Sequence, residues 1–207
     1  ARWGLKKVTL PPVFFRKLRL TMLKEFLESF TPPVYGRTKR SAATYKTVSS
    51  YCESKLTVLI EEYSVVKNDQ QLRREMRNDI DYYLRRYHKY CIEQRDGMQA
   101  HYHEVGHDDN CDFEHLIPAS RIRDLLLAGI ITVEQAFNSP TVRLSRTKHK
   151  ELNEAGWGDK TPDMWLPFRR YSQLFKDSKF ETFDGVPVDP EKWTLEKHFE
   201  YFKHLII

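Results

Sequence analysis

The segment from Cys111 to Gly156 constrains the fold of this chain more than any other part of it. It opens with a short run that ends in Glu114 and His115, and this run is predicted to be a strand. Apolar residues between Arg121 and Phe137 then look helical, so a helical insertion is expected after the strand. The segment therefore predicts a small unit that mixes strands with helices.

The second half of the segment supplies another strand and a helix with polar side chains. Asn138 stands in a turn before a strand predicted at residues 141–144, and a helix is predicted to follow Ser145. On that helix His149 and Asn153 are four residues apart, so they share one face. This order of elements lets both side chains reach one ion beside Glu114.

These residue types meet the needs of phosphodiester hydrolysis, which requires a base, a cation and a group that holds the base in one tautomer. His115 is the candidate base because imidazole titrates near neutral pH. Glu114, His149 and Asn153 are candidate metal ligands. Asn138 is the candidate for fixing the ring of His115.

Strand geometry adds a condition to this hypothesis. Successive side chains of a strand point to opposite faces, so Glu114 and His115 reach one phosphate only if the strand ends or distorts at this pair. Asp112, on the Glu114 side of the strand, is an auxiliary candidate ligand.

The segment resembles the HNH, or ββα-metal, nucleases over residues 109–156. The resemblance rests on the run Glu114-His115-Leu116-Ile117-Pro118, on Asn138 at the family's middle Asn, and on His149 and Asn153 at its helix ligands. The chain departs from the family pattern in having Glu114 where Asp or His is more common. It also carries the helical insertion and a longer spacing from Asn138 to His149.

The resemblance implies a metal-dependent endonuclease that cuts DNA and leaves 5′-phosphate and 3′-hydroxyl ends. A set of carboxylate, imidazole and amide ligands suits Mg²⁺ or Mn²⁺, with Zn²⁺ or Ni²⁺ as alternatives. One ββα site cuts one strand, so cutting both strands requires a homodimer or two successive nicks.

The charge of the chain is concentrated near its start. Residues 1–50 hold eleven Lys or Arg against two Glu, whereas the whole chain of 207 residues has a formal net charge of +5. A basic segment suits a polyanion because each neutralised phosphate releases condensed counterions. The candidate DNA contacts are Arg37, Lys39, Arg40, Arg73, Arg74 and Arg77.

The rest of the chain predicts a helical framework. Apolar periodicity predicts helices over residues 11–30, 51–66 and 69–95, the last with Asp69 as N-cap. The fold class is α+β: a basic helical N-terminal portion (1–100), a ββα-metal core with a helical insertion (101–156), and a C-terminal extension (157–207) packed on the core. That extension is predicted to be an irregular wrap over residues 157–190, ending in a helix that begins at Asp189 and Pro190.

Two other interpretations remain open at this point. The spacings of His101, His103, His107 and Cys111 are compatible with zinc, which suggests a non-catalytic nucleic-acid-binding protein with a structural zinc site. Alternatively, the aromatic C-terminal region is the contact surface of an interaction protein. Loss of cleavage in a folded His115→Ala variant would favour the nuclease interpretation.

The composition of the chain limits the cellular compartments in which it is expected. Three cysteines without a C-x-x-C pair fit neither a disulfide framework nor a four-cysteine zinc site. No apolar run approaches the roughly 20 residues of a bilayer span, and the N-terminus lacks the order of a secretory signal. We therefore expect a soluble, intracellular, cytoplasmic protein without membrane contact.

Overall fold

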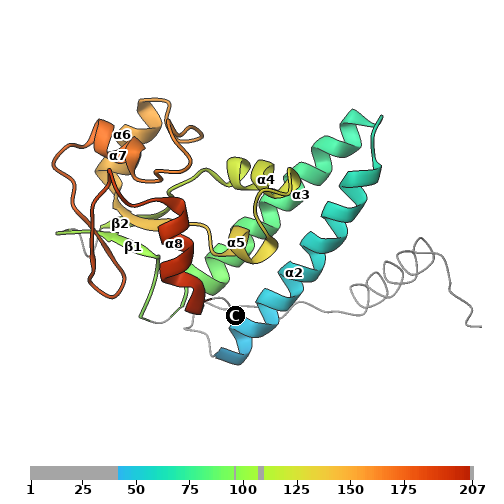
Figure 1. Ribbon diagram of the computed structural model, residues 1–207, viewed down its shortest axis with the longest axis horizontal. Helices are drawn as coiled ribbons and strands as arrows, with labels where there is room; N and C mark the ends of the chain where they lie inside the picture. Colours follow the sequence, from blue (N-terminus) through green and yellow to red (C-terminus); the bar gives the residue numbers. More distant parts are fainter. Residues whose placement is uncertain (1–41, 96, 107–109, 206–207) are drawn as a thin grey trace, which may run out of the picture.

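The computed structural model describes residues 42–95, 97–106 and 110–205, which form long helices and one mixed sheet (Figure 1). This arrangement confirms the predicted α+β class. The predicted helix over residues 11–30 lies outside the described residues, and so do Arg37, Lys39 and Arg40.

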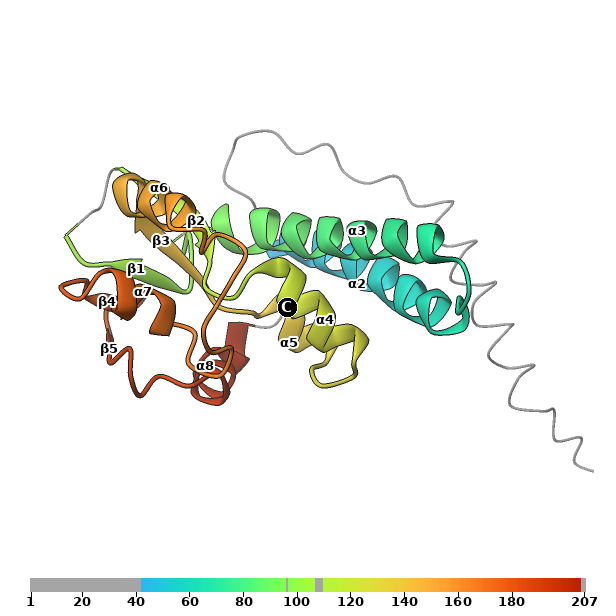
Figure 2. The same cartoon turned by 90° about the horizontal axis from the view of Figure 1, so that it is seen from above.

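Two helices form a hairpin at one side of the molecule. Helices α2 (Ala42–Val65) and α3 (Gln70–Tyr87) pack side by side along their lengths (Figure 2). The carboxylate of Asp69 accepts a hydrogen bond of 2.9 Å from the backbone N–H of Leu72, so the predicted N-cap is confirmed. Helix α2 begins earlier than the predicted residue 51.

Helix α3 changes its winding before it ends. It continues into η1, a π-helical segment from His88 to Glu93, so the helix predicted to run to about residue 95 is not uniform. Three side chains of this segment, His88, Cys91 and Ile92, are buried. Short π-helical stretches are rare and are found disproportionately at functional sites, which directs attention to His88.

The sheet has five strands in the order β2-β3-β1-β4-β5. They are β1 (Tyr102–Glu104), β2 (Cys111–His115), β3 (Thr141–Ser145), β4 (Phe180–Thr182) and β5 (Pro187–Val188). Strands β2 and β3 were both predicted and pair in antiparallel fashion, whereas the short β1 was not predicted and pairs in parallel with β3. In this order β2 is an edge strand.

The elements between and after β2 and β3 also follow the predicted order. Helices α4 (Ala119–Leu127) and α5 (Val133–Phe137) form the insertion, and α6 (Arg146–Glu154) follows β3 directly and packs on β2 and β3. Helix α6 ends at Glu154, and two residues later Gly156 adopts a φ of 72° and donates its N–H to the carbonyl of Asn153. A positive φ costs glycine little, so this residue suits a helix end. Strands β2 and β3 with helix α6 thus form a ββα unit.

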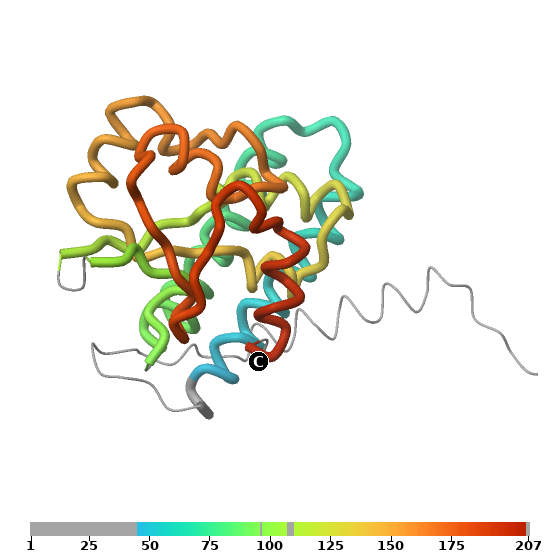
Figure 3. Tube along the Cα trace, turned by 60° about the vertical axis from the view of Figure 1, so that its left-hand side comes forward, coloured from blue at the N-terminus to red at the C-terminus, as the bar shows by residue number. Residues whose placement is uncertain are grey.

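The C-terminal part is more regular than predicted. It contains α7 (Arg169–Leu174), β4, β5, α8 (Leu195–Phe202) and a 3-10 turn, η2 (Lys203–Leu205). Strands β4 and β5 extend the sheet beyond β1, and Figure 3 traces this part of the chain in orange and red. The prediction that the last helix begins at Asp189 is wrong. Its N-cap is Thr194, whose hydroxyl accepts the N–H of Lys197 at 3.1 Å, while Asp189 accepts the N–H of Glu191 in a turn.

One hydrophobic cluster joins the three predicted parts of the chain. It extends from α2 and α3 through the insertion and the sheet to the C-terminal helix. Its fully buried members include Leu56, Ile80, Leu84, Tyr102, Leu116, Ile117, Ile122, Val142, Phe168, Tyr171 and Phe202. No disulfide joins the three described cysteines, Cys52, Cys91 and Cys111. Among the described residues, none of the helices has the length and apolarity needed to cross a bilayer.

Candidate active site

Strand β2 is regular to its last residue and does not distort at the Glu-His pair. Glu114 lies opposite Val142 and His115 lies opposite Thr141 in the antiparallel register. The two neighbouring side chains therefore point to opposite faces of the sheet. However, β2 is an edge strand that ends at His115, so the condition that the strand ends at this pair is met.

On one face, Glu114 meets His149 of α6. The Nε2 atom of His149 lies 3.4 Å from Oε2 of Glu114, and Nδ1 lies 3.0 Å from Oδ2 of Asp112. The imidazole is therefore held between two carboxylates. Hydrogen bonding to Glu114, and secondarily to Asp112, raises the pKa of His149 to about 9. The structure thus brings together two of the predicted ligands, Glu114 and His149, and the auxiliary Asp112.

A buried arginine fixes the orientation of Glu114. The Nη2 atom of Arg170, whose side chain is fully buried, donates to Oε1 of Glu114 at 2.7 Å and to the backbone carbonyl of His115 at 2.5 Å. Its Nη1 atom donates to the carbonyl of Trp157 at 3.1 Å. Arg170 therefore engages one carboxylate oxygen and leaves Oε2 of Glu114 directed toward His149.

On the other face of β2, His115 contacts a second histidine, His88 of the π-helical segment. Nε2 of His115 lies 2.9 Å from Nδ1 of His88, and Nε2 of His88 lies 2.9 Å from the carbonyl oxygen of Phe137. His88 is completely buried, and burial lowers its pKa to about 4. It is therefore neutral at physiological pH and carries one ring proton.

The hydrogen-bond partners determine where the protons of both rings lie. The carbonyl of Phe137 only accepts, so the proton of neutral His88 is on Nε2 and its Nδ1 is an acceptor. The Nε2–H of His115 consequently donates to Nδ1 of His88, which leaves the lone pair of His115 on Nδ1. Among the described residues, nothing hydrogen-bonds to this Nδ1 atom.

The electrostatic surroundings keep His115 neutral. Although the residue is partly exposed, desolvation of the ring, together with His88, Arg85 and Arg170, holds its pKa well below the ordinary value. A neutral imidazole with a free lone pair is the form that a general base requires.

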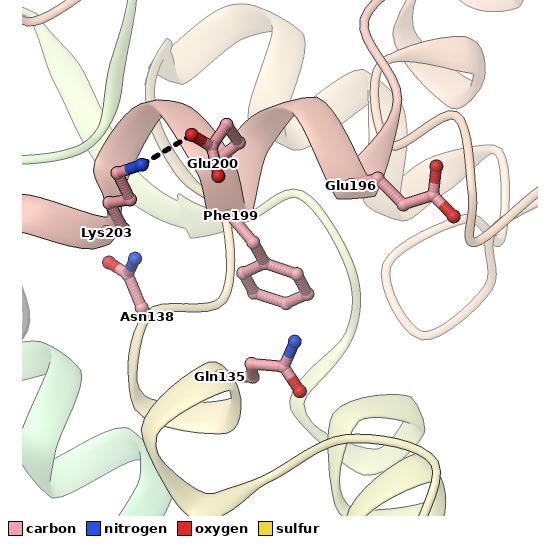
Figure 4. A pocket seen from close by; sticks show the side chains of 6 residues that line it. All are labelled: Gln135, Asn138, Glu196, Phe199, Glu200 and Lys203. Atoms are coloured by element: carbon pink, nitrogen blue, oxygen red, sulfur yellow. Dashed lines mark hydrogen bonds and ion pairs between the residues drawn. The ribbon is translucent and has the colours of Figure 1, made fainter.

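Asn138 does not hold the ring of His115, contrary to the prediction. Its side chain is buried, where Oδ1 accepts from Nε2 of His101 at 2.9 Å and Nδ2 donates to the carbonyl of Phe202 at 3.1 Å. Asn138 lines a pocket of about 390 Å³ between α5 and α8 (Figure 4). The longer spacing from Asn138 to His149 leaves this amide in the core, and His88 makes the contact to His115 instead.

The third predicted ligand, Asn153, is exposed on α6. Its Oδ1 atom packs so closely against Gly158 that an added Cβ there would lie 2.3 Å away. Within the described part of the chain, Asn153 makes no hydrogen bond with Glu114 or His149. It therefore supports the turn after α6 in this structure.

The donor atoms present fit a metal that takes few ligands from protein. No group of three or more His, Cys, Asp or Glu side chains in the described ranges is placed to hold an ion. Two cis ligands of an ion with bonds of 2.0–2.1 Å lie roughly 3 Å apart, which is close to the 3.4 Å between Glu114 and His149. Mg²⁺ commonly takes one or two protein ligands and completes its shell with water and substrate phosphates.

The alternative zinc ligands are not assembled in the described residues. His101 bonds to Thr141 and Asn138 through its two ring nitrogens, and Nε2 of His103 bonds to the carbonyl of Met98. His107 lies outside the described residues. His101, which suggested a ligand in the sequence, is instead a fully buried core residue.

Two of the candidate DNA contacts on α3 stabilise the fold. Arg73 donates to the carbonyls of Tyr63 and Val66, and its guanidinium lies 3.8 Å from the centre of the Tyr63 ring. Arg77 forms an ion pair of 2.8 Å with Asp124 of α4. Of the three predicted α3 contacts, Arg74 alone is exposed.

Sequence reasoning missed both His88 and Arg170. Each acts on the β2 pair from a distant part of the chain, and neither belongs to a local motif. Comparisons of the chain with models of known families, with curated proteins and with solved structures found no match, so its function has to be inferred from the geometry of this site.

Proposed function

We propose that this protein is a metal-dependent endonuclease that hydrolyses phosphodiester bonds in DNA, with His115 as the general base. The observation that carries the proposal is the placement of two different groups at the last two residues of the edge strand β2. A neutral imidazole with its tautomer fixed lies on one face, and a carboxylate-imidazole pair lies on the other. The resemblance of residues 109–156 to HNH nucleases supports the same chemistry.

In the proposed reaction, Nδ1 of His115 removes a proton from a water molecule next to the phosphate. The water oxygen then bonds to phosphorus, the bond from phosphorus to the 3′-oxygen breaks, and the leaving oxygen takes a proton from solvent. His88 keeps the His115 ring in the reactive tautomer, and Arg170 keeps Glu114 in place. A divalent ion bound by Glu114 and His149 would offset charge on the phosphate and the leaving oxygen.

Incubation with supercoiled plasmid, with Mg²⁺ or Mn²⁺ and with EDTA, tests the proposal. We expect conversion to the nicked form with metal and none with EDTA, because a single ββα unit acts on one strand. Linear product that rises with protein concentration would indicate a dimer. A plasmid that remains supercoiled with each of Mg²⁺, Mn²⁺, Zn²⁺ and Ni²⁺ would contradict the proposal.

Metal affinity is expected to increase with pH. Because the pKa of His149 is raised to about 9, this residue carries a proton that must leave before Nε2 can bind an ion. Titration calorimetry with Mn²⁺ at about pH 7 and about pH 8.5 should show tighter binding at the higher pH and proton release at the lower one. His149→Gln should remove most of the pH dependence, while Lys150→Gln on the exposed side of α6 should retain it. Equal affinity at both pH values in the wild type would mean that His149 is not a ligand.

A further inference from the structure

Positive charge gathers on the side of the molecule that carries His115. Arg85 and Lys89 are exposed and four residues apart on α3 and η1, so they share one side of the helix, and Lys89 directly follows His88 in the chain. Neither forms an ion pair with another described residue. These two cations therefore stand free next to the helical turn that contacts His115.

A third cation approaches from the sheet. Arg143 of β3 lies directly opposite Phe113, which puts its side chain on the same face of the sheet as His115. Its Nη2 atom lies 3.4 Å from the carbonyl oxygen of Cys111, so the guanidinium extends across to the edge strand. Phe113 is partly exposed, and its ring contacts that of His115 edge-on at 5.5 Å between centroids.

Electrostatic effects place these cations close to the site. The guanidinium of Arg85 lowers the pKa of both His88 and His115, and Lys89 and Arg143 both lower that of Glu93. The charge of Arg85 therefore acts on His115, the candidate base, and the charges of Lys89 and Arg143 both act on Glu93 at the end of η1.

Acidic residues near this surface do not cancel its charge. Lys89 and Arg143 act on Glu93, and Glu181 lies on the same face of the sheet as Arg143, so two carboxylates stand against the three cations. Asp81 is paired with Arg123 at 2.5 Å, and Glu114 is paired with Arg170 on the opposite face of β2. The surface therefore keeps an excess of positive charge.

We propose that the phosphodiester backbone of a nucleic acid lies across this surface, which we name the His115 face and define by Arg85, Lys89, Phe113, His115 and Arg143. Arg85, Lys89 and Arg143 each neutralise a backbone phosphate, and Phe113 offers an aromatic ring to a base next to the scissile bond. The proposal rests on the proposed function, because it supplies the substrate contacts of that site. The His115 face differs from the α3 contacts predicted from the sequence. At a helical rise of 1.5 Å per residue, Arg74 lies roughly 16 Å from Arg85 along the helix axis.

The salt dependence of DNA binding tests this proposal. Binding of a labelled duplex is measured by fluorescence anisotropy in EDTA, between about 50 and 200 mM salt. Each lost phosphate contact reduces the slope of log affinity against log salt by about 0.9, so Arg85→Ala/Lys89→Ala should reduce it by roughly 1.8 and Arg143→Ala by about 0.9. The charge-retaining Arg85→Lys/Lys89→Arg should keep the wild-type slope.

Lys67→Ala is the matched control, because Lys67 is exposed in the turn between α2 and α3, at the opposite end of α3 from η1. It should leave the slope unchanged, and thermal unfolding should show that all variants remain folded. The proposal is overturned if the double variant keeps the wild-type slope, if Lys67→Ala lowers it equally, or if the wild type does not bind duplex. Because EDTA prevents cleavage, a changed slope without plasmid nicking would leave this surface intact and reject only the hydrolytic function.

Discussion

Substitution of His115 by alanine is expected to reduce plasmid cleavage by roughly 10²- to 10⁴-fold, which is the usual loss when a general base is removed. His115 donates to His88 and accepts from no described residue at Nδ1, so its removal takes away the base without removing a proposed ligand. Mn²⁺ affinity measured by calorimetry should therefore stay near that of the wild type. Nicking rates at saturating metal provide the measurement.

Two further variants distinguish a catalytic role of His115 from a purely structural one. His204→Ala alters an exposed histidine far along the chain and should leave the nicking rate unchanged. His88→Phe removes the acceptor that fixes the His115 tautomer, and it should lower the rate by roughly 10- to 100-fold, as loss of an orienting partner commonly does. Activity of His115→Ala within a few-fold of wild type would exclude His115 as the base.

Acidification from about pH 7.5 to about pH 5 is expected to reduce the free energy of unfolding, and His88 and His198 together contribute about 4 kcal/mol to that reduction. Burial lowers the pKa of His88 to about 4 and that of His198 to about 3, whereas an unfolded histidine titrates near 6.5. Below pH 6.5 the unfolded state binds protons that the folded state excludes, so stability falls with pH until the folded pKa is reached. Each of the two histidines contributes about 2 kcal/mol at pH 5.

Other titratable groups also affect how the free energy of unfolding depends on pH. Burial also holds the pKa of His101 well below its ordinary value, which adds to the acid sensitivity. His149 has the opposite sign: its pKa is raised to about 9, so its contribution is present below about pH 6.5 and is lost as pH rises toward 9. Maximal stability is therefore expected near pH 6.5 to 7.

Urea unfolding at the two pH values measures this effect, and point variants assign it. His198→Gln should reduce the difference between the two pH values by about 2 kcal/mol, because the neutral amide does not titrate. His204→Gln, at an exposed position, should leave the difference unchanged. A wild-type difference below about 1 kcal/mol would mean that these histidines are not held neutral in the fold.

Local patterns in the sequence predicted the ββα unit because its elements are contiguous and strongly patterned. The run ending in His115, the strand at residues 141–145 and the helix carrying His149 all lie where the sequence places them. The spacing of these elements also brings Glu114 and His149 together. Local order was therefore enough to predict this half of the candidate site.

The other half depends on contacts that local patterns do not report. His88 and His115 are 27 residues apart, and Arg170 is 56 residues from Glu114. Strand β1 has three residues, and the sequence suggests His101 and His103 only as candidates for an alternative zinc site, not as residues at or in a strand. A short buried strand has too few residues to show alternation, so only its pairing in the sheet identifies it.

Because Arg170 lies on α7, outside the ββα unit, that unit depends on a residue that an excised fragment would lose. A fragment cut at residues 109–156 would retain every residue of the nuclease resemblance, yet it would lack the cation that neutralises Glu114 and the imidazole that orients His115. In such an excised module, Glu114 would have no fixed counterion and the two tautomers of His115 would interconvert. The ββα unit therefore cannot be transferred alone. Grafting it onto another scaffold would also require the helical hairpin, which carries His88, and the C-terminal region, which carries Arg170.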